Sequence, residues 1–313
     1  MTPLSSTDIR GTWATLLLPI RSEESIDFDL LRSEIHAFAA AKVDGVYSNG
    51  SAGEFYAQTE DEFDRLHQLL ADECERAHLP FQIGASHPSP QISLGRLQRA
   101  KALKPGAFQI VLPDWFPPSL AEIHRFIDGM ARAAYPIPLV LYNPPHAKRR
   151  LDPSEWVQVV DEHPAIAGIK VAGGDQGWYE SMKGVLERIS VFIPGHHLAT
   201  GLSRGAHGAY SNMACLNPAA AQRWYHLCRS DPTSGLATEA RINRFITESV
   251  LPVIKAKQLS NMAADKALAA AGGWLPGLST RLRWPYTSAT AEDAAHFRAA
   301  ARALIPEFFP TRS

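Results

Sequence analysis

The sequence of 313 residues lacks several features that would assign it directly to a class of protein. Cysteine is scarce: Cys74, Cys215 and Cys228 are widely spaced, odd in number and in no CxxC pair. This pattern argues against a disulfide framework and against a cysteine-ligated zinc site. It predicts reduced, buried thiols in a protein of cytoplasmic localisation.

An excess of charge and a long apolar run are missing as well. The formal net charge is −1, which gives no electrostatic attraction to nucleic acid or to an anionic membrane. No apolar run is long enough to span a bilayer, and residues 1–10 are polar, so no signal peptide is expected. We therefore expect a small-molecule partner and neither a nucleic acid nor a membrane as partner.

What the sequence does contain is a series of short apolar segments that alternate with helical patterns. Helix starts are marked by Thr59 with Glu62, by Ser119, and by Asp152 followed by Pro153. The strands are expected at residues 12–20, 44–48, 81–85, 107–112, 139–142, 165–172, 190–193 and 208–211.

This alternation predicts an α/β fold in which eight parallel strands close into a (β/α)8 TIM barrel. An open doubly wound sheet is the competing architecture, but no GxGxxG motif follows the first strand. Beyond residue 231 the strand pattern stops, and helices are expected at residues 239–257, with a break at Pro252, and at residues 261–271 and 291–304. We predict a barrel catalytic domain over residues 1–230 and a C-terminal helical extension over residues 231–313.

The sixth predicted strand carries the most informative residue. Lys170 lies near the end of the apolar segment 165–172, where burial would favour its neutral amine and lower its pKa. Such an amine is a nucleophile that forms Schiff bases with ketones. The alternative is a lysine whose ammonium snorkels past the strand end into water.

Two other strand ends carry polar residues, and active sites of barrels lie at the C-terminal strand ends. Gly50-Ser51-Ala52-Gly53 follows the second strand, where exposed backbone N–H groups and the Ser51 hydroxyl could bind a carboxylate. Tyr142 ends the fifth strand and could carry a proton in the barrel mouth. The alternatives are an ordinary turn at Ser51 and a half-buried core phenol at Tyr142.

Together these stretches resemble the dihydrodipicolinate synthase / N-acetylneuraminate lyase family of class I aldolases, and the resemblance covers nearly the whole chain. No single motif is specific, but the set is family-like in order and spacing. The motifs are Ile26-Asp27, Asp44-Gly45-Val46, Gly50-Ser51-Ala52-Gly53-Glu54, Tyr142-Asn143-x-Pro145, Gly168-Ile169-Lys170 and Gly205-Ala206-x-Gly208-Ala209-Tyr210-Ser211.

The resemblance implies a lyase, either an aldolase or a dehydratase, that works without a cofactor and assembles as a homo-oligomer, a tetramer or a dimer. A 2-keto acid such as pyruvate or a 2-keto-3-deoxy sugar acid would form a Schiff base with Lys170, and Tyr142 would shuttle protons. Ser51 and the N–H of Ala52 would hold the substrate carboxylate. Tyr210 would line this site through its backbone, and Gly195 would border the distal pocket.

The sequence also departs from the family pattern. Trp115 stands where the synthases have a relay tyrosine, and indole cannot carry that proton. Ala147 stands where they have a carboxylate-binding arginine, although the basic residues 148–150 follow. These changes argue against lysine biosynthesis and sialic acid cleavage.

His196 and His197 occupy the loop after the seventh strand, where the family often has acidic or glycine-rich residues for the distal substrate. Adjacent histidines rarely share a metal, so we expect no metal site, and His196 is a candidate substrate contact. Capping of a helix and exposure to solvent are the alternatives for the pair. A non-catalytic keto-acid-binding or sensor protein on the same barrel remains the alternative function.

Overall fold

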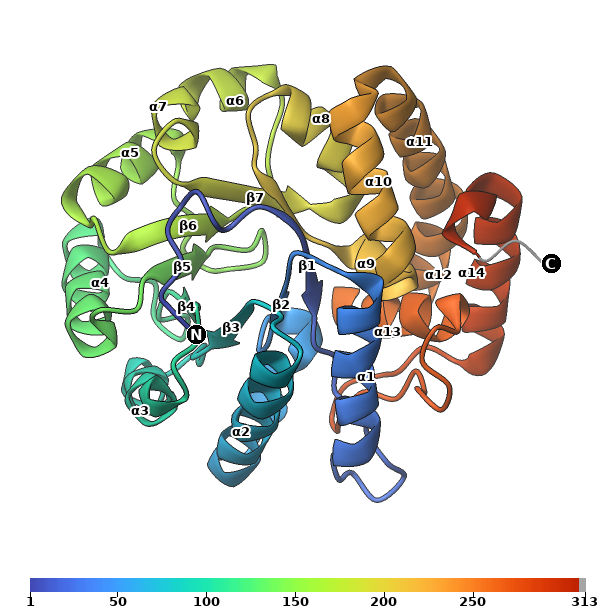
Figure 1. Cartoon of the computed structure of the whole chain (residues 1–313), viewed down its shortest axis with the longest axis horizontal. Coiled ribbons are helices and arrows are strands. Elements are labelled where there is room, and N and C mark those ends of the chain that lie inside the picture. The colour runs from blue at the N-terminus through green and yellow to red at the C-terminus, as the bar shows by residue number, and fades with distance from the viewer. Residues whose placement is uncertain (310–313) are drawn as a thin grey trace.

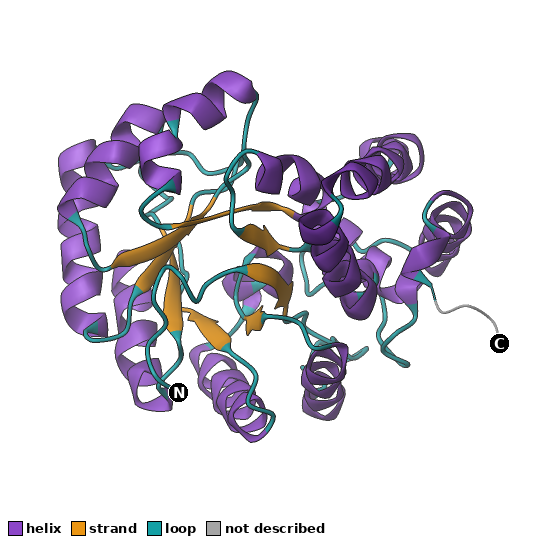
Figure 2. Ribbon diagram, turned by 45° about the horizontal axis from the view of Figure 1, so that its top comes forward, coloured by secondary structure: helices purple, strands orange, loops and turns teal. Residues whose placement is uncertain are grey.

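The computed structural model describes residues 1–309 and has the α/β architecture that the sequence predicts. Eight parallel strands close into a barrel in chain order, and helices surround it (Figures 1 and 2). The strands are β1 (Gly11–Thr15), β2 (Gly45–Tyr47), β3 (Phe81–Gly84), β4 (Ala107–Val111), β5 (Leu139–Tyr142), β6 (Ile166–Lys170), β7 (Ser190–Pro194) and β8 (Gly208–Tyr210).

The helices cover the outside of the barrel and continue beyond its last strand. Those that alternate with the strands are α1 (Phe28–Ala41), α2 (Glu60–Arg76), α3 (Pro90–Ala100), α4 (Leu120–Ala134), α5 (Pro153–Glu162), α6 (Gln176–Ser181), α7 (Lys183–Leu186) and α8 (Leu198–Ser203). After β8 come α9 (Asn212–Leu216), α10 (Pro218–Ser230), α11 (Pro232–Phe245), α12 (Leu251–Ala256), α13 (Asn261–Gly272) and α14 (Ala291–Leu304).

The first strand is shorter than predicted, because its apolar run does not stay in the sheet. β1 ends at Thr15 rather than Ile20. Two residues further on, the backbone N–H of Leu17 donates to the buried carboxylate of Glu34 at 2.9 Å and not to a carbonyl oxygen of a neighbouring strand. The predicted break at Pro252 is also absent: a π-helical segment, Ile246–Val250, joins α11 to α12 without an interruption.

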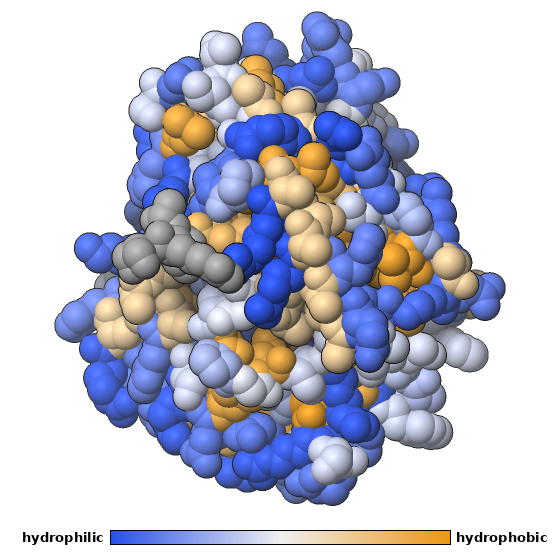
Figure 3. Space-filling view, turned by 90° about the vertical axis from the view of Figure 1, so that its right-hand side faces the viewer, coloured by the Kyte–Doolittle hydropathy of each residue, from blue (hydrophilic) through white to orange (hydrophobic). Residues whose placement is uncertain are grey.

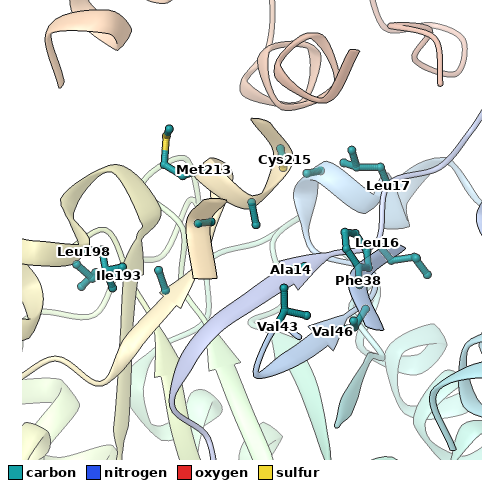
Figure 4. Close-up of a cluster of buried hydrophobic side chains, with 14 of the residues drawn as sticks. Ala14, Leu16, Leu17, Phe38, Val43, Val46, Ile193, Leu198, Met213 and Cys215 are labelled. Carbon is teal, nitrogen blue, oxygen red and sulfur yellow. The ribbon is translucent and has the colours of Figure 1, made fainter. Parts of the chain in front are cut away.

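Two apolar layers hold the barrel together. A small inner cluster, which includes Trp13, Tyr47, Phe192 and Tyr210, fills the barrel interior. The larger cluster lies between the sheet and the helices, and Figure 4 shows part of it, with Val46 near Phe38 of α1 and Ile193 beside Leu198. The three cysteines are free and buried. No helix within residues 1–309 is long and apolar enough to cross a membrane.

Of the C-terminal helices, α9 and α10 pack against β1, and the others lie on the same side of the barrel (Figure 1). Their outer face is mostly hydrophilic, with a narrow band of apolar residues (Figure 3). Helix α13 reaches back to the loop after β2 through a fully buried ion pair, in which the Lys266 ammonium donates to the Glu54 carboxylate. The other carboxylate oxygen of Glu54 accepts from the backbone N–H of Arg283 at 2.9 Å.

Loss of this pair should destabilise the protein strongly. Lys266→Met leaves the Glu54 carboxylate buried without its cationic partner, which costs about 3–5 kcal/mol. We expect the urea midpoint of unfolding to fall accordingly. The matched control is Arg244→Met, which removes an exposed pair with Glu248 and should cost only about 0.3–0.5 kcal/mol. Equal, small losses in the two variants would contradict the anchoring role.

Candidate active site

The ends of β5 and β6 bring the two predicted catalytic side chains together. Tyr142 and Lys170 are the last residues of these strands and face each other in the parallel register. The Nζ atom of Lys170 lies 4.2 Å from the centroid of the Tyr142 ring. The sheet register, and not a flexible loop, therefore fixes the distance between amine and phenol.

The amine of Lys170 points into the protein rather than out into water. Nζ donates a hydrogen bond to the Tyr47 hydroxyl at 3.2 Å, and it lies 5.3 Å from the centroid of the Tyr210 ring. Burial lowers the pKa of Lys170 to about 8, although the charge of Asp265 acts in the opposite direction. At pH 7 about a tenth of the amine is therefore neutral, far more than for an exposed lysine, and this neutral form is the one that nucleophilic attack requires.

The loop after β2 places Ser51 beside the phenol. Ser51 begins a short 3-10 helix, Ser51–Gly53, and its Oγ lies 3.2 Å from the Tyr142 hydroxyl. Burial raises the pKa of Tyr142 to about 12, while the Ser51 hydrogen bond lowers it. The loop approaches closely because residue 50 is glycine: a Cβ there would meet the Tyr47 ring at 2.8 Å and Lys170 Nζ at 3.6 Å.

The same loop is held under backbone strain. Asn49 and Glu54 both adopt left-handed conformations, with φ of 52° and 50°, which non-glycine residues rarely do. Gln58 donates to the Asn49 side chain at 2.8 Å, and Lys266 holds Glu54. Glu54 thus braces the loop from behind and leaves Ser51 free to face the cavity.

A cavity of about 480 Å³ opens above the amine and is large enough for a small keto acid. The barrel strands and the loops that follow them contribute most of the polar residues of its wall. The C-terminal helices and the π-helical segment contribute a mostly apolar side, made of Ile246, Val250, Leu251, Ile254, Met262 and Leu268. Among the described residues, Lys170 is the one lysine or arginine in the lining.

The remaining predicted site residues lie around this cavity in different ways. Ala52, His196 and Tyr210 line it, and the Tyr210 hydroxyl donates to Gln82 at 2.6 Å. Gly195 is buried, and a Cβ there would meet the Ser211 Oγ at 2.4 Å, so the glycine allows close packing between the β7 and β8 ends.

His196 and His197 are neighbours in the cavity wall but do not converge on one point with a third ligand. The side chain of Asn212 holds His196. Its Oδ1 accepts from the His196 backbone N–H at 3.1 Å, and its Nδ2 lies 3.0 Å from Nδ1 of the His196 ring. Burial lowers the pKa of His196 to about 4, so its ring is neutral near neutral pH. Within residues 1–309, the one group of three potential ligands is His124, Glu162 and His163, outside the cavity lining.

Two residues of the site were missed by sequence reasoning. Tyr47 resembles a core aromatic in a short apolar strand, yet its hydroxyl accepts the hydrogen bond from Lys170. Asp265 lies in the alanine-rich helix α13 and lines the cavity. The sequence marks Asp265 only by the Asp265-Lys266 pair, the two charged residues of an otherwise uncharged helix.

Chemically, this arrangement suits nucleophilic attack by an amine on a carbonyl carbon. Lys170 is partly neutral, and Tyr142 and Ser51 can exchange hydrogen bonds with oxygen atoms of a substrate.

Comparison with known proteins agrees with this geometry. A sequence model of the "Dihydrodipicolinate synthetase family" matches residues 8–304. The 4-hydroxy-tetrahydrodipicolinate synthase of Thermomicrobium roseum is 28% identical over 214 residues, 68% of this chain and 70% of the relative. The N-acetylneuraminate lyase of Citrobacter koseri is 24% identical over 203 residues, 64% of this chain and 68% of the relative.

Solved structures show a similar fold. The crystal structure of YagE, a prophage protein of the dihydrodipicolinic acid synthase family from E. coli K12 in complex with pyruvate, superposes with a TM-score of 0.81. The two chains are 21% identical, and the match covers 95% of this chain and 98% of YagE. At this identity the match shows that the barrel and its helices are shared.

Proposed function

Because the chain belongs to the dihydrodipicolinate synthetase family of Schiff-base aldolases and lyases, we propose that Lys170 condenses with the keto carbon of a 2-keto acid. Pyruvate or a 2-keto-3-deoxy sugar acid fits this role. The observation that carries the proposal is the position of the Lys170 amine, inside the cavity, hydrogen-bonded to Tyr47 and 4.2 Å from the centre of the Tyr142 ring.

The proposed reaction uses the imine as an electron sink. The neutral amine adds to the keto carbon, water leaves, and the protonated imine acidifies the neighbouring carbon or allows an adjacent bond to break. Tyr142 carries protons to and from the substrate oxygens, with Ser51 as its hydrogen-bond partner. The backbone N–H groups of Ser51 and Ala52 hold the carboxylate of the 2-keto acid.

The charge of the cavity bears on the rest of the substrate. Lys148 donates to the backbone of Trp115 at 3.1 Å, and Arg149 pairs with Glu155, so neither is aimed at the substrate. Among the described residues, the cavity lining thus contains no lysine or arginine besides Lys170 that could bind a second carboxylate of the substrate. This favours a substrate with one carboxylate and an uncharged distal part.

Trapping with borohydride tests the nucleophile. Wild-type protein incubated with pyruvate and borohydride should gain one reduced adduct per chain, mapped by peptide mass spectrometry to Lys170. Lys170→Ala should gain none, since its side chain has no amine. Lys183→Ala, which removes an exposed lysine on α7, is the matched control and should react like the wild type. An adduct that persists in Lys170→Ala contradicts the proposal.

Substitution of the phenol separates an enzyme from a binding protein. Tyr142→Phe should lower turnover of a cleavable 2-keto acid by about 10²-fold or more, because it removes the proton carrier but not the amine. Tyr135→Phe, on an exposed tyrosine, should leave turnover unchanged. If the wild type forms the adduct but turns over no aldol or dehydration substrate, the chain is a keto-acid-binding protein instead.

We also propose that the chain is a homo-oligomer, a tetramer or a dimer. Trp115 and Phe116, adjacent in the loop after β4, are 86% and 81% exposed, which is unfavourable for two large aromatic side chains in water. Light scattering should give a mass of two or four chains, and a Trp115→Ser, Phe116→Ser double variant should shift it downward. A monomeric wild type would contradict this proposal.

A further inference from the structure

Helix α13 adds a carboxyl group to the cavity wall. Asp265 lines the cavity together with Lys170, Tyr142 and Ser51. The next residue, Lys266, holds Glu54 at the back of the Ser51 loop. The position of Asp265 is therefore fixed relative to that loop by a buried ion pair, and the carboxyl is an integral part of the cavity wall.

This carboxyl has no partner of its own within residues 1–309. It is half-buried at the cavity surface, where it accepts no hydrogen bond from the described residues and forms no ion pair with them. The fully buried carboxylates of Glu34 and Glu54, in contrast, each accept a hydrogen bond from a backbone N–H. A carboxylate without a partner inside a protein costs folding free energy. Its burial raises its pKa to about 7, although the charge of Lys170 lowers it. A stable fold gains nothing from such a group, so a chemical role explains it best.

We propose that Asp265 is a catalytic residue that accepts a proton from the Lys170 ammonium and returns it during formation of the Schiff base. This step rests on the proposed function. Its balance is simple: the ammonium loses one proton to the Asp265 carboxylate, and the free amine adds to the keto carbon. The Asp265 carboxylic acid then protonates the hydroxyl of the carbinolamine, which leaves as water, so that the protonated imine and the carboxylate remain.

The acidities of the two groups suit this exchange. The pKa of Lys170, about 8, and that of Asp265, about 7, lie close together, so moving the proton between them is nearly balanced at neutral pH. No ion pair within 4.0 Å joins them among the described residues, so the proton crosses the cavity through the substrate or a water molecule. The phenol of Tyr142, with a pKa of about 12, is protonated at neutral pH and can take up a proton only after it has donated its own, so it is not the first acceptor of this proton.

Several other groups face the same space and must be counted in any pH dependence. They come from the barrel with its loops and from α9. Burial raises the pKa of the Cys215 thiol and of the phenols of Tyr47, Tyr142 and Tyr210, so these groups stay neutral near neutral pH. The groups that face Lys170 or line the cavity beside it are Tyr47, Tyr142, His146, His196, His197, Tyr210 and Cys215. Asp265 is the one carboxyl among the described residues of the lining.

The rate of borohydride trapping of pyruvate on Lys170 at pH 7 tests the proposal, because two roles of Asp265 predict opposite signs. If Asp265 acts only through its charge, Asp265→Asn lowers the pKa of Lys170, leaves more neutral amine and makes trapping faster. If it carries the proton, Asp265→Asn makes trapping about 10²-fold slower. We expect the slower rate, with partial recovery in Asp265→Glu, which keeps a carboxyl group.

Controls keep the outcomes distinct. Asp72→Asn, on an exposed carboxyl of α2, should trap like the wild type. Asp265→Asn should be no less stable than the wild type at pH 8, because ionised Asp265 destabilises the fold above its raised pKa. Unchanged or faster trapping in Asp265→Asn, or no recovery in Asp265→Glu, overturns this inference. Absence of trapping in the wild type would instead overturn the proposed function.

Discussion

The cost of keeping an amine away from water governs this structure. Lys170 ends a buried strand, and its Nζ has one hydrogen-bond acceptor, the Tyr47 hydroxyl, and aromatic faces around it. Aromatic faces stabilise a cation more weakly than water or a carboxylate in contact would. The amine therefore loses its proton far more readily than an exposed lysine does, and the neutral form that results is the one that Schiff-base chemistry needs.

Everything near the amine is fixed by rigid elements. The β5–β6 register sets the distance from Tyr142, and a strained loop with left-handed residues at both ends holds Ser51. Such strain persists only where surrounding contacts determine the backbone. Those contacts come partly from α13, through Lys266, and from Arg283 beyond it. The helices after the barrel thus contribute to the precision of the site as well as to its walls.

Local patterns were enough to predict the barrel and to place three candidate site residues at its strand ends, and tertiary contacts explain what was missed. Lys170, Tyr142 and Ser51 each follow an apolar strand, so the common position of strand ends in a barrel brings them together. Tyr47 carries no local mark that separates it from a core aromatic. Asp265 reaches the site only through the packing of α13. The predicted extension of β1 to Ile20 failed because Leu17 bonds to Glu34, a contact between distant residues.

Asp265 and Lys266 are consecutive residues, and successive side chains on a helix point about 100° apart. One of them faces the chamber and the other grips the loop that carries Ser51. A residue inserted or deleted within α13 ahead of Asp265 would turn both side chains by about 100° about the helix axis and move them away from these positions together. The register of this one helix therefore links the wall of the cavity to the support of the Ser51 loop.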